Sequence, residues 1–195
     1  MIQNPRNCLD KSDEELVKLS LENSENFLCL MKRFEDKIFK FVRRISGFSN
    51  EEIEDIVQEI FLKVYENLNN FDPKLKFSSW IYRIARNQTI DESRKKKSEP
   101  KFIKIFDNDE DRSFLENIAS DTDFIEDFEN QEVSKNILTA LSRVRLEYRE
   151  VLILRFFEDK DYGEISDILK KPIGTISTLV SRAKKELRDL MNNQK

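Results

Sequence analysis

The chain has no histidine, and glycine, proline and cysteine are scarce among its 195 residues. Without histidine it can form neither a His-ligated metal site nor a His-dependent catalytic triad. The three glycines (Gly47, Gly163 and Gly174) lie too far apart for a phosphate-binding or dinucleotide-binding loop. The two cysteines, Cys8 and Cys29, give no disulfide framework and no metal-ligand spacing, which favours a reducing cytoplasm as the compartment.

Long apolar runs are also missing. No run approaches the ~20 residues that a membrane span needs, and residues 1–10 contain no apolar signal-peptide core. We therefore expect a cytoplasmic chain with no membrane span. No recognisable catalytic constellation is present, but paired polar and ionisable side chains are frequent enough that their number alone does not rule out an enzyme.

What remains is rich in helix-forming Lys, Glu, Leu and Ile, which predicts an all-α fold. Residues 98–132 hold twelve acids and three bases, a net charge of −9 in a chain of −4, so the rest carries +5. This predicts two small helical domains, residues 1–97 and 133–195, joined by an acidic linker at 98–132. Each domain has a basic cluster: Arg94 to Lys97 in the first, and Arg182, Lys184, Lys185 and Arg188 in the second.

Apolar spacing of three to four residues predicts the individual helices. In the first domain, a capping box of Ser12 with Glu15 begins a short helix. A long helix follows, with apolar positions spaced from Phe27 to Ile45, and ends at Gly47 and Ser49. Two more helices follow at 51–68 and 76–97. In the second domain, helices are predicted from 133 onward, at about 147–158, at 161–170 and at 174–190, with Pro172 in the last turn.

The predicted helix 51–68 carries an unusual outer face. Its core stripe is Ile53, Val57, Ile60, Val64 and Leu68, and its opposite face holds Asp55, Glu59, Leu62 and Glu66, with Gln58 beside them. A leucine among acids is typical of a protein-docking face, where one apolar anchor is surrounded by orienting charges. A single exposed leucine is also ordinary on a protein surface.

The predicted helix 76–97 combines basic residues with aromatic ones. Phe77, Trp80, Ile81, Ile84 and Gln88 share one face, while Arg83, Asn87, Ile90 and Arg94 share another and lead into Lys95, Lys96 and Lys97. Arginine and lysine neutralise phosphates, and asparagine can pair with a base edge. Aromatic rings around the turn before this helix could stack on unpaired bases. The body of the Trp80 ring is expected in the core, and the stacking hypothesis needs only its edge, or a neighbour, to reach a base.

Residues 161–190 have the layout of a helix-turn-helix: a short helix, a tight turn and a longer helix. The longer helix has a predicted buried stripe of Ile176, Leu179, Val180, Ala183, Leu187 and Leu190. The opposite face carries Thr178, Ser181, Arg182, Lys185 and Arg188, with Ser177 at its edge. This face suits DNA, but helical hairpins without a DNA role look similar.

The order of these motifs resembles that of the bacterial sigma-70 family. Segments 55–65 (DIVQEIFLKVY), 71–73 (FDP) and 77–87 (FSSWIYRIARN), with Asp91, are similar to sigma region 2. Segments 148–155 (YREVLILR), 162–166 (YGEIS), 172–175 (PIGT) and 181–187 (SRAKKEL) are similar to region 4. The short length resembles the extracytoplasmic-function (ECF) group.

The resemblance implies that the chain directs core RNA polymerase to promoters. It also implies that the chain is not itself an enzyme and takes no metal, cofactor or small-molecule substrate. Asp55, Gln58, Glu59 and Leu62 would bind the clamp helices of the polymerase β′ subunit. Trp80, Arg83, Asn87, Arg94, Lys95, Lys96 and Lys97 would recognise and melt the −10 element, with the turn at 71–79 capturing a flipped base. Ser177, Thr178, Ser181, Arg182, Lys185 and Arg188 would read the −35 element.

The same resemblance implies further partners. The C-terminal domain would touch the β flap, the acidic linker would lie in a polymerase channel, and an anti-sigma factor would regulate the chain. Residues 177–179 read Ser-Thr-Leu where many members carry Lys-Ser-Arg, which would place the −35 contacts differently. Two alternatives stay open: an autonomous helix-turn-helix regulator that binds duplex DNA as a dimer, and a helical adaptor with no DNA role.

Overall fold

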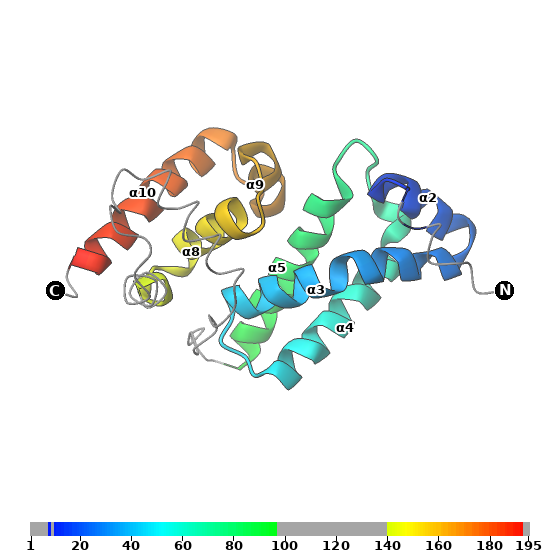
Figure 1. Cartoon of the computed structure of the whole chain (residues 1–195), viewed down its shortest axis with the longest axis horizontal. Helices are drawn as coiled ribbons and strands as arrows, with labels where there is room; N and C mark the ends of the chain where they lie inside the picture. The colour runs from blue at the N-terminus through cyan, green and yellow to red at the C-terminus, as the bar shows by residue number, and fades with distance from the viewer. Residues whose placement is uncertain (1–7, 9, 97–139, 193–195) are drawn as a thin grey trace. The chain divides into compact units, whose positions relative to one another are not determined.

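The structure is a computed structural model that describes residues 8, 10–96 and 140–192. All regular elements in these residues are helical, as the composition predicts. The chain divides into two compact units, Met1–Pro100 and Lys101–Lys195 (Figure 1). The acidic segment 98–132 and the predicted helical start at 133–139 lie outside the described residues, so the predicted linker stays a prediction.

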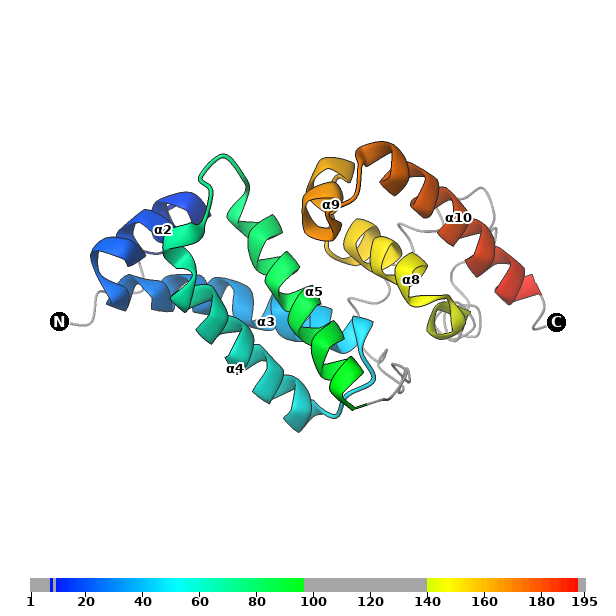
Figure 2. The same ribbon diagram turned by 180° about the vertical axis from the view of Figure 1, so that it is seen from behind.

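Within residues 10–96, the N-terminal unit contains four α-helices: α2 (Asp13–Glu22), α3 (Phe27–Ile45), α4 (Asn50–Glu66) and α5 (Phe77–Lys95). Two 3₁₀ turns, η1 (Ser24–Asn26) and η2 (Leu68–Asn70), lie between them. Helix α3 packs against α2, α4 and α5, and α4 and α5 lie side by side (Figure 2). Its buried residues recur every three to four positions, from Leu30 through Phe34 and Ile38 to Phe41, which is why one stripe of α3 forms the centre of the core.

Two of these helices begin at capping boxes. Ser12 Oγ accepts from the Glu15 amide at 3.1 Å while the Ser12 amide donates to Glu15 Oε2 at 2.7 Å, which confirms the predicted start of α2. Ser49 and Glu52 do the same for α4. Such boxes satisfy amides that have no partner inside the helix.

The C-terminal unit contains α8 (Leu146–Leu152), α9 (Tyr162–Leu169) and α10 (Ile173–Asn192), and α10 packs against both α8 and α9. Residues 140–143 are also helical. The predicted buried stripe of α10 is confirmed from Ile176 to Leu187. Leu190, in the last turn, is only half-buried.

The helix predicted at about 147–158 is not one regular α-helix. It changes after Leu152 into a π-helical segment, η3 (Ile153–Phe157). The Glu158 amide donates to the Ile153 carbonyl at 3.1 Å, a wider turn than an α-helix makes. Asp159 then adopts a left-handed backbone, with φ of 48°. The apolar spacing of three to four residues does not distinguish these geometries, so the sequence could not reveal the change.

The two cysteines are joined. Cys8 and Cys29 form a disulfide that ties residue 8 to α3 across 21 positions of sequence. The expectation that these cysteines give no disulfide is therefore wrong. Their spacing says nothing about distance in space, whereas the fold places their Cα atoms 5.5 Å apart, within the range that a disulfide spans.

Candidate functional site

The outer face of α4 presents the predicted docking residues together. Asp55, Gln58, Glu59 and Leu62 are all exposed, and Leu62 is 57% exposed. Glu59 is also tied to the neighbouring helix, because it accepts a hydrogen bond from Gln88 Nε2. The side-chain oxygen of Gln88, Oε1, in turn accepts a hydrogen bond from Lys63 Nζ. The buried Gln88 thus fixes one carboxylate of this face.

The aromatic residues near the start of α5 pack mainly against one another. The ring centroids of Phe71, Phe77 and Trp80 lie 5.5 to 5.8 Å apart. Tyr82 packs against Phe41 at 5.0 Å. Trp80 is only 6% exposed, so its ring belongs to the core, as one of the two expectations had it.

A pocket of about 320 Å³ lies where α4, η2 and α5 meet. It brings together three of the predicted residues, Trp80, Arg83 and Asn87. The remaining lining residues are Lys63, Asn67, Asn70, Ile84, Gln88 and Asp91. Amide, guanidinium and ammonium groups around a concave site suit a base edge and its phosphate.

Three of these lining residues, Lys63, Asn67 and Asn70, were not predicted. The asparagines at 67, 69 and 70, just before the turn, were the available signal. Ile90, which was expected on the polar face with Asn87, is instead buried, at 8% exposed. Helix α5 contacts α2, α3 and α4, so it buries a wider face than the helical wheel indicated.

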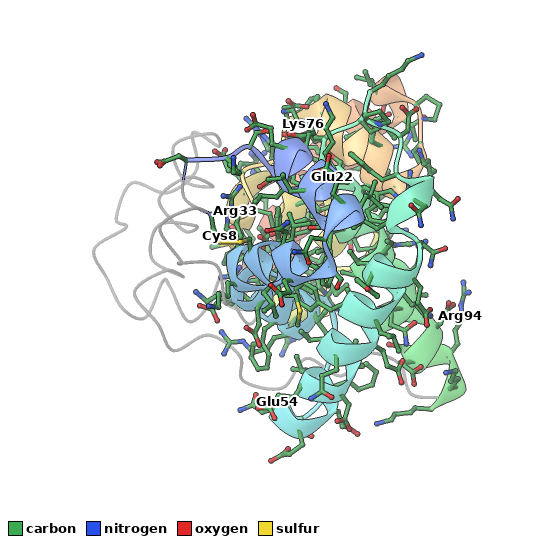
Figure 3. All side chains as sticks on the ribbon, turned by 90° about the vertical axis from the view of Figure 1, so that its right-hand side faces the viewer. Cys8, Glu22, Arg33, Glu54, Lys76 and Arg94 are labelled. Atoms are coloured by element: carbon green, nitrogen blue, oxygen red, sulfur yellow. A yellow bond between two sulfur atoms is a disulfide. The ribbon has the colours of Figure 1, made fainter. Side chains whose placement is uncertain are left out.

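The basic end of α5 is paired with carboxylates of its own unit. Arg94 lies 3.4 Å from Asp91, and Lys95 lies 2.6 Å from Glu92. Lys96 pairs with Glu52 and lies over the Phe48 ring. Arg94 projects outward from the end of the helix (Figure 3). Lys97 lies outside the described residues.

These pairs shift two pKa values. The pKa of Lys95 is raised because its ammonium donates a hydrogen bond to Glu92. The pKa of Glu52 is lowered, first by the hydrogen bond from Lys96 and then by the Ser49 amide. Both shifts favour the charged forms, so the lysines of this cluster are charged and are paired with carboxylates. Exposed pairs of this kind are weak and are readily exchanged for another anion.

Helices α9 and α10 form a well-defined helix-turn-helix. Asp161 caps α9 in a third capping box, with Glu164. Lys170 ends it in the left-handed conformation, with φ of 53°, and Ser166 Oγ donates to the Lys171 carbonyl at 2.6 Å. The Thr175 amide then donates to the Pro172 carbonyl at 2.8 Å as α10 begins. These bonds fix the turn and therefore the direction of α10.

All the residues predicted on the outer face of α10 are exposed: Ser177, Thr178, Ser181, Arg182, Lys185 and Arg188. The Thr178 hydroxyl donates to the Gly174 carbonyl at 2.9 Å, so only its acceptor lone pairs face outward. Lys184, from the same basic cluster, is half-buried and lies over the Phe156 ring at 5.5 Å. It therefore belongs to the packed side of the helix.

Two further residues at the start of α10 were missed. Ile173 is 56% exposed, although it is large and apolar. A Cβ atom added at Gly174 would meet nothing within 4 Å, so packing within the chain does not require glycine there. An exposed isoleucine and open space beside the helix start suit close approach to DNA, where an apolar side chain can contact a thymine methyl.

The described residues limit other chemistry. In the described ranges, no group of His, Cys, Asp and Glu is arranged to hold a metal ion. No helix among them is long and apolar enough to cross a bilayer.

Family models match both units. Residues 30–99 match sigma-70 region 2, and residues 134–187 match sigma-70 region 4. The chain is also 34% identical over 173 residues to the ECF RNA polymerase sigma factor SigW of Bacillus subtilis, covering 86% of this chain and 92% of that protein.

This chain belongs to the ECF group of sigma-70 family sigma factors. Solved structures show where the same fold occurs. CnrH, in complex with the cytosolic domain of CnrY, matches the sigma factor with a TM-score of 0.66 at 19% identity, over 95% of this chain and 100% of that one. RpoE of Bartonella quintana, in complex with the anti-sigma factor NepR, matches with a TM-score of 0.61 at 21% identity, over 86% of this chain and 98% of that one.

The family assignment connects the surfaces described above with sigma regions. The α4 face, the pocket and all of α5 lie within the region 2 match. Helix α9, the turn and α10 as far as Leu187 lie within the region 4 match of this sigma factor. Sigma factors are not an enzyme class.

Proposed function

We propose that this sigma factor binds core RNA polymerase and starts transcription at promoters by reading a −10 and a −35 element. The observation that carries the proposal is the α9–turn–α10 arrangement. It exposes every predicted −35 residue while the opposite stripe of α10 is buried. A buried stripe opposite a polar and basic face is the geometry with which a recognition helix enters the major groove.

For the −35 element, the start of α10 meets base edges and its later residues hold the backbone. Ser177, Thr178 and Ser181 are small enough for close approach to the bases. Arg182, Lys185 and Arg188 lie further along the same face and bind phosphates.

For the −10 element, the pocket beside α5 takes an unstacked base. Arg83 and Asn87 supply the polar contacts, and Trp80 forms a wall of the pocket. Extruding a base costs stacking energy, which a pocket with matched polar groups offsets. Arg94, Lys95 and Lys96, with Lys97, hold the phosphates by exchanging their internal carboxylate partners for phosphate oxygens.

Core polymerase docks on the outer face of α4. Leu62 is the apolar anchor, and Asp55, Gln58 and Glu59 orient the contact with the β′ clamp helices. The C-terminal unit adds a contact with the β flap. The acidic segment 98–132 suits a polymerase channel that otherwise accepts nucleic acid.

We also propose that an anti-sigma factor regulates the chain, since RpoE, a sigma factor of similar fold, was solved with the anti-sigma factor NepR bound. The sigma factor acts in the cytoplasm, where polymerase and promoters are, and it catalyses no reaction of its own. It needs no cofactor or small-molecule substrate for these tasks.

A run-off transcription assay tests the proposal. Purified protein is mixed with bacterial core polymerase and genomic fragments, including the one upstream of its own gene, with a core-only control. New discrete start sites are the expected result. A folded protein that neither binds core nor yields transcripts, yet shifts duplex DNA alone, would instead identify an autonomous regulator.

Variants then assign the surfaces. Asn87→Ala is expected to relax the −10 sequence preference, because an amide that pairs with a base edge is removed. Lys18→Ala, on an exposed position of α2, is the matched control. Loss of overall affinity with unchanged preference would remove Asn87 from the base-reading residues.

A further inference from the structure

Cys8 and Cys29 are not among the residues assigned above to DNA or polymerase. Cys29 is on α3, and both cysteines are half-buried, so small oxidants and reductants can reach them. They are the only cysteines in the chain. Their pairing therefore has no intramolecular competitor, and a third thiol cannot divert it.

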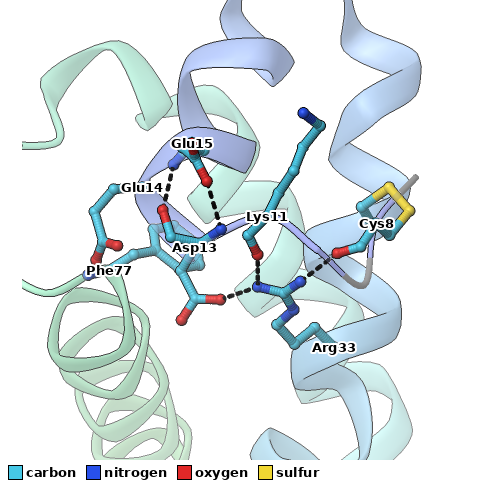
Figure 4. Close-up of polar contacts among 9 residues, drawn as sticks. Cys8, Lys11, Asp13, Glu14, Glu15, Arg33 and Phe77 are labelled. Atoms are coloured by element: carbon cyan, nitrogen blue, oxygen red, sulfur yellow. Dashed lines mark hydrogen bonds and ion pairs between the residues drawn. A yellow bond between two sulfur atoms is a disulfide. The ribbon is translucent and has the colours of Figure 1, made fainter. Parts of the chain in front are cut away.

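Arg33 reinforces the same attachment through a fork of hydrogen bonds (Figure 4). Its guanidinium donates to the Cys8 carbonyl at 2.5 Å, to the Lys11 carbonyl at 2.9 Å and to Asp13 Oδ1 at 2.6 Å. Arg33 and Cys29 stand four residues apart, on one face of α3. That face holds the chain leading into α2 by one covalent bond and by one charged side chain.

Helix α2 carries this attachment to the start of α5. The carboxylate of Glu14 accepts from the Phe77 amide at 3.0 Å, although the two residues are 63 positions apart. The residue before α5, Lys76, gives the helix no side-chain cap. Helix α2 also contacts both η2 and α5, which flank the turn at 71–76. The position of α2 therefore determines whether the first turn of α5 is capped.

We propose that Cys8 and Cys29 form a reversible thiol-oxidation site whose disulfide locks α2 in place and thereby orders the turn that leads into α5. The structural half of this proposal is independent of function. Its consequence for promoters rests on the proposed function, in which the pocket lined by Asn70 and Trp80, on either side of this turn, receives the −10 base.

The chemistry is a two-electron oxidation by a hydroperoxide. One thiolate attacks the O–O bond, becomes a sulfenic acid and, with hydrogen peroxide, releases water. The second thiol attacks the sulfenic sulfur, which forms the S–S bond and releases a second water. A cellular dithiol reverses the reaction by exchange, and it is itself oxidised to a disulfide as both cysteines regain their protons.

In the reduced protein Arg33 still binds Lys11 and Asp13, so α2 remains docked but opens more often. The disulfide suppresses this opening because it ties residue 8 covalently to α3, so the chain leading into α2 has fewer detached conformations. We expect amide exchange in α2 and at Phe77 to slow by roughly 10- to 100-fold on oxidation. Amides of α10, in the other unit, should not change.

The experiment compares the full chain after treatment with hydrogen peroxide and after treatment with a dithiol. Thiol counting and intact mass should show two thiols lost, with a mass decrease of two hydrogens. Cys8→Ser and Cys29→Ser, checked for folding by the emission of the single tryptophan, should each exchange like the reduced protein in both treatments. Thiols that stay free under peroxide, or exchange that is equal in both redox forms, would overturn the proposal.

A transcription arm separates the proposal from the proposed function. With core polymerase and a promoter opened by the protein, the oxidised form should yield roughly 3- to 10-fold more open complex, since an ordered turn needs no ordering on binding. Equal yields from both forms would overturn the link to promoters. Redox-dependent exchange without transcripts in either form would support the oxidation site and overturn the proposed function.

Discussion

The hydrogen bond between Glu14 and the Phe77 amide leads to a prediction about stability. Replacing Glu14 by alanine removes the acceptor that caps α5 from 63 residues away. The Phe77 side chain is fully buried, so water replaces that acceptor poorly. Loss of a helix cap costs about 1 kcal/mol, and loss of a charged acceptor costs somewhat more. We expect Glu14→Ala to lower the free energy of unfolding of the N-terminal unit by about 1–2 kcal/mol.

The assay uses the single tryptophan of the chain. Trp80 is buried in the N-terminal unit, so its emission during urea unfolding reports that unit and not the C-terminal one. For a unit of this size the expected change lowers the urea midpoint by roughly 0.5–1 M. Glu14→Gln should fall between wild type and alanine, because the amide oxygen still accepts but carries no charge.

Glu22→Ala is the matched control. It removes a carboxylate from the same helix at an exposed position in the last turn, where a negative charge is slightly unfavourable. Its midpoint should equal that of wild type or exceed it. If Glu14→Ala and Glu22→Ala unfold at the same urea concentration, the long-range cap does not stabilise α5 and the reasoning fails.

Four further predictions concern the proposed surfaces and the C-terminal unit. Arg182→Ala and Lys185→Ala should each reduce the salt slope of promoter binding by roughly 1; titrations at several salt concentrations that give an unchanged slope would remove them from the interface. Gly174→Ala should not lower the thermal midpoint, because a Cβ atom there meets nothing within 4 Å, but it should weaken binding to the −35 element. Undiminished binding would contradict the hypothesis that the start of α10 approaches DNA closely. Leu62→Ala should weaken binding to core RNA polymerase in a pull-down without changing Trp80 emission. If the variant and wild type retain the same amount of polymerase, Leu62 is not the anchor. Partial burial opposes ionisation of the Glu186 carboxyl, but hydrogen bonds from Arg145 outweigh this effect and lower the pKa of Glu186. The ionised Glu186 therefore stabilises the folded protein above the unfolded pKa of 4.5, and this stabilisation is lost as the pH falls through the folded pKa. Glu186→Gln should reduce this loss of stability in acid when unfolding is measured as a function of pH.

Sequence patterns predicted those parts of the fold that depend on neighbouring residues. The capping box at Ser12 joins residues three positions apart, and the buried stripe from Ile176 to Leu187 follows from helical spacing alone. The exposed faces of α4 and α10 followed for the same reason. Once one side of a helix is apolar, the opposite side is fixed by geometry.

The sequence could not show contacts between distant positions. The cap from Glu14 to Phe77, the Cys8–Cys29 bond and the burial of Ile90 each depend on how helices pack. The pocket beside α5 combines residues from α4, η2 and α5. Its polar lining was therefore predicted only for the residues that share α5.

The paired cations at the end of α5 have a consequence for how the protein distributes over a chromosome. Arg94, Lys95 and Lys96 already neutralise carboxylates of their own unit. When these side chains bind a random duplex, each exchanges a carboxylate for a phosphate, so this cluster adds little binding free energy. Non-specific binding draws its strength from such phosphate contacts, and a genome offers roughly 10⁶–10⁹ competing sites. Self-pairing thus reduces, without abolishing, what this end of the molecule contributes to non-specific binding before polymerase brings it to a promoter.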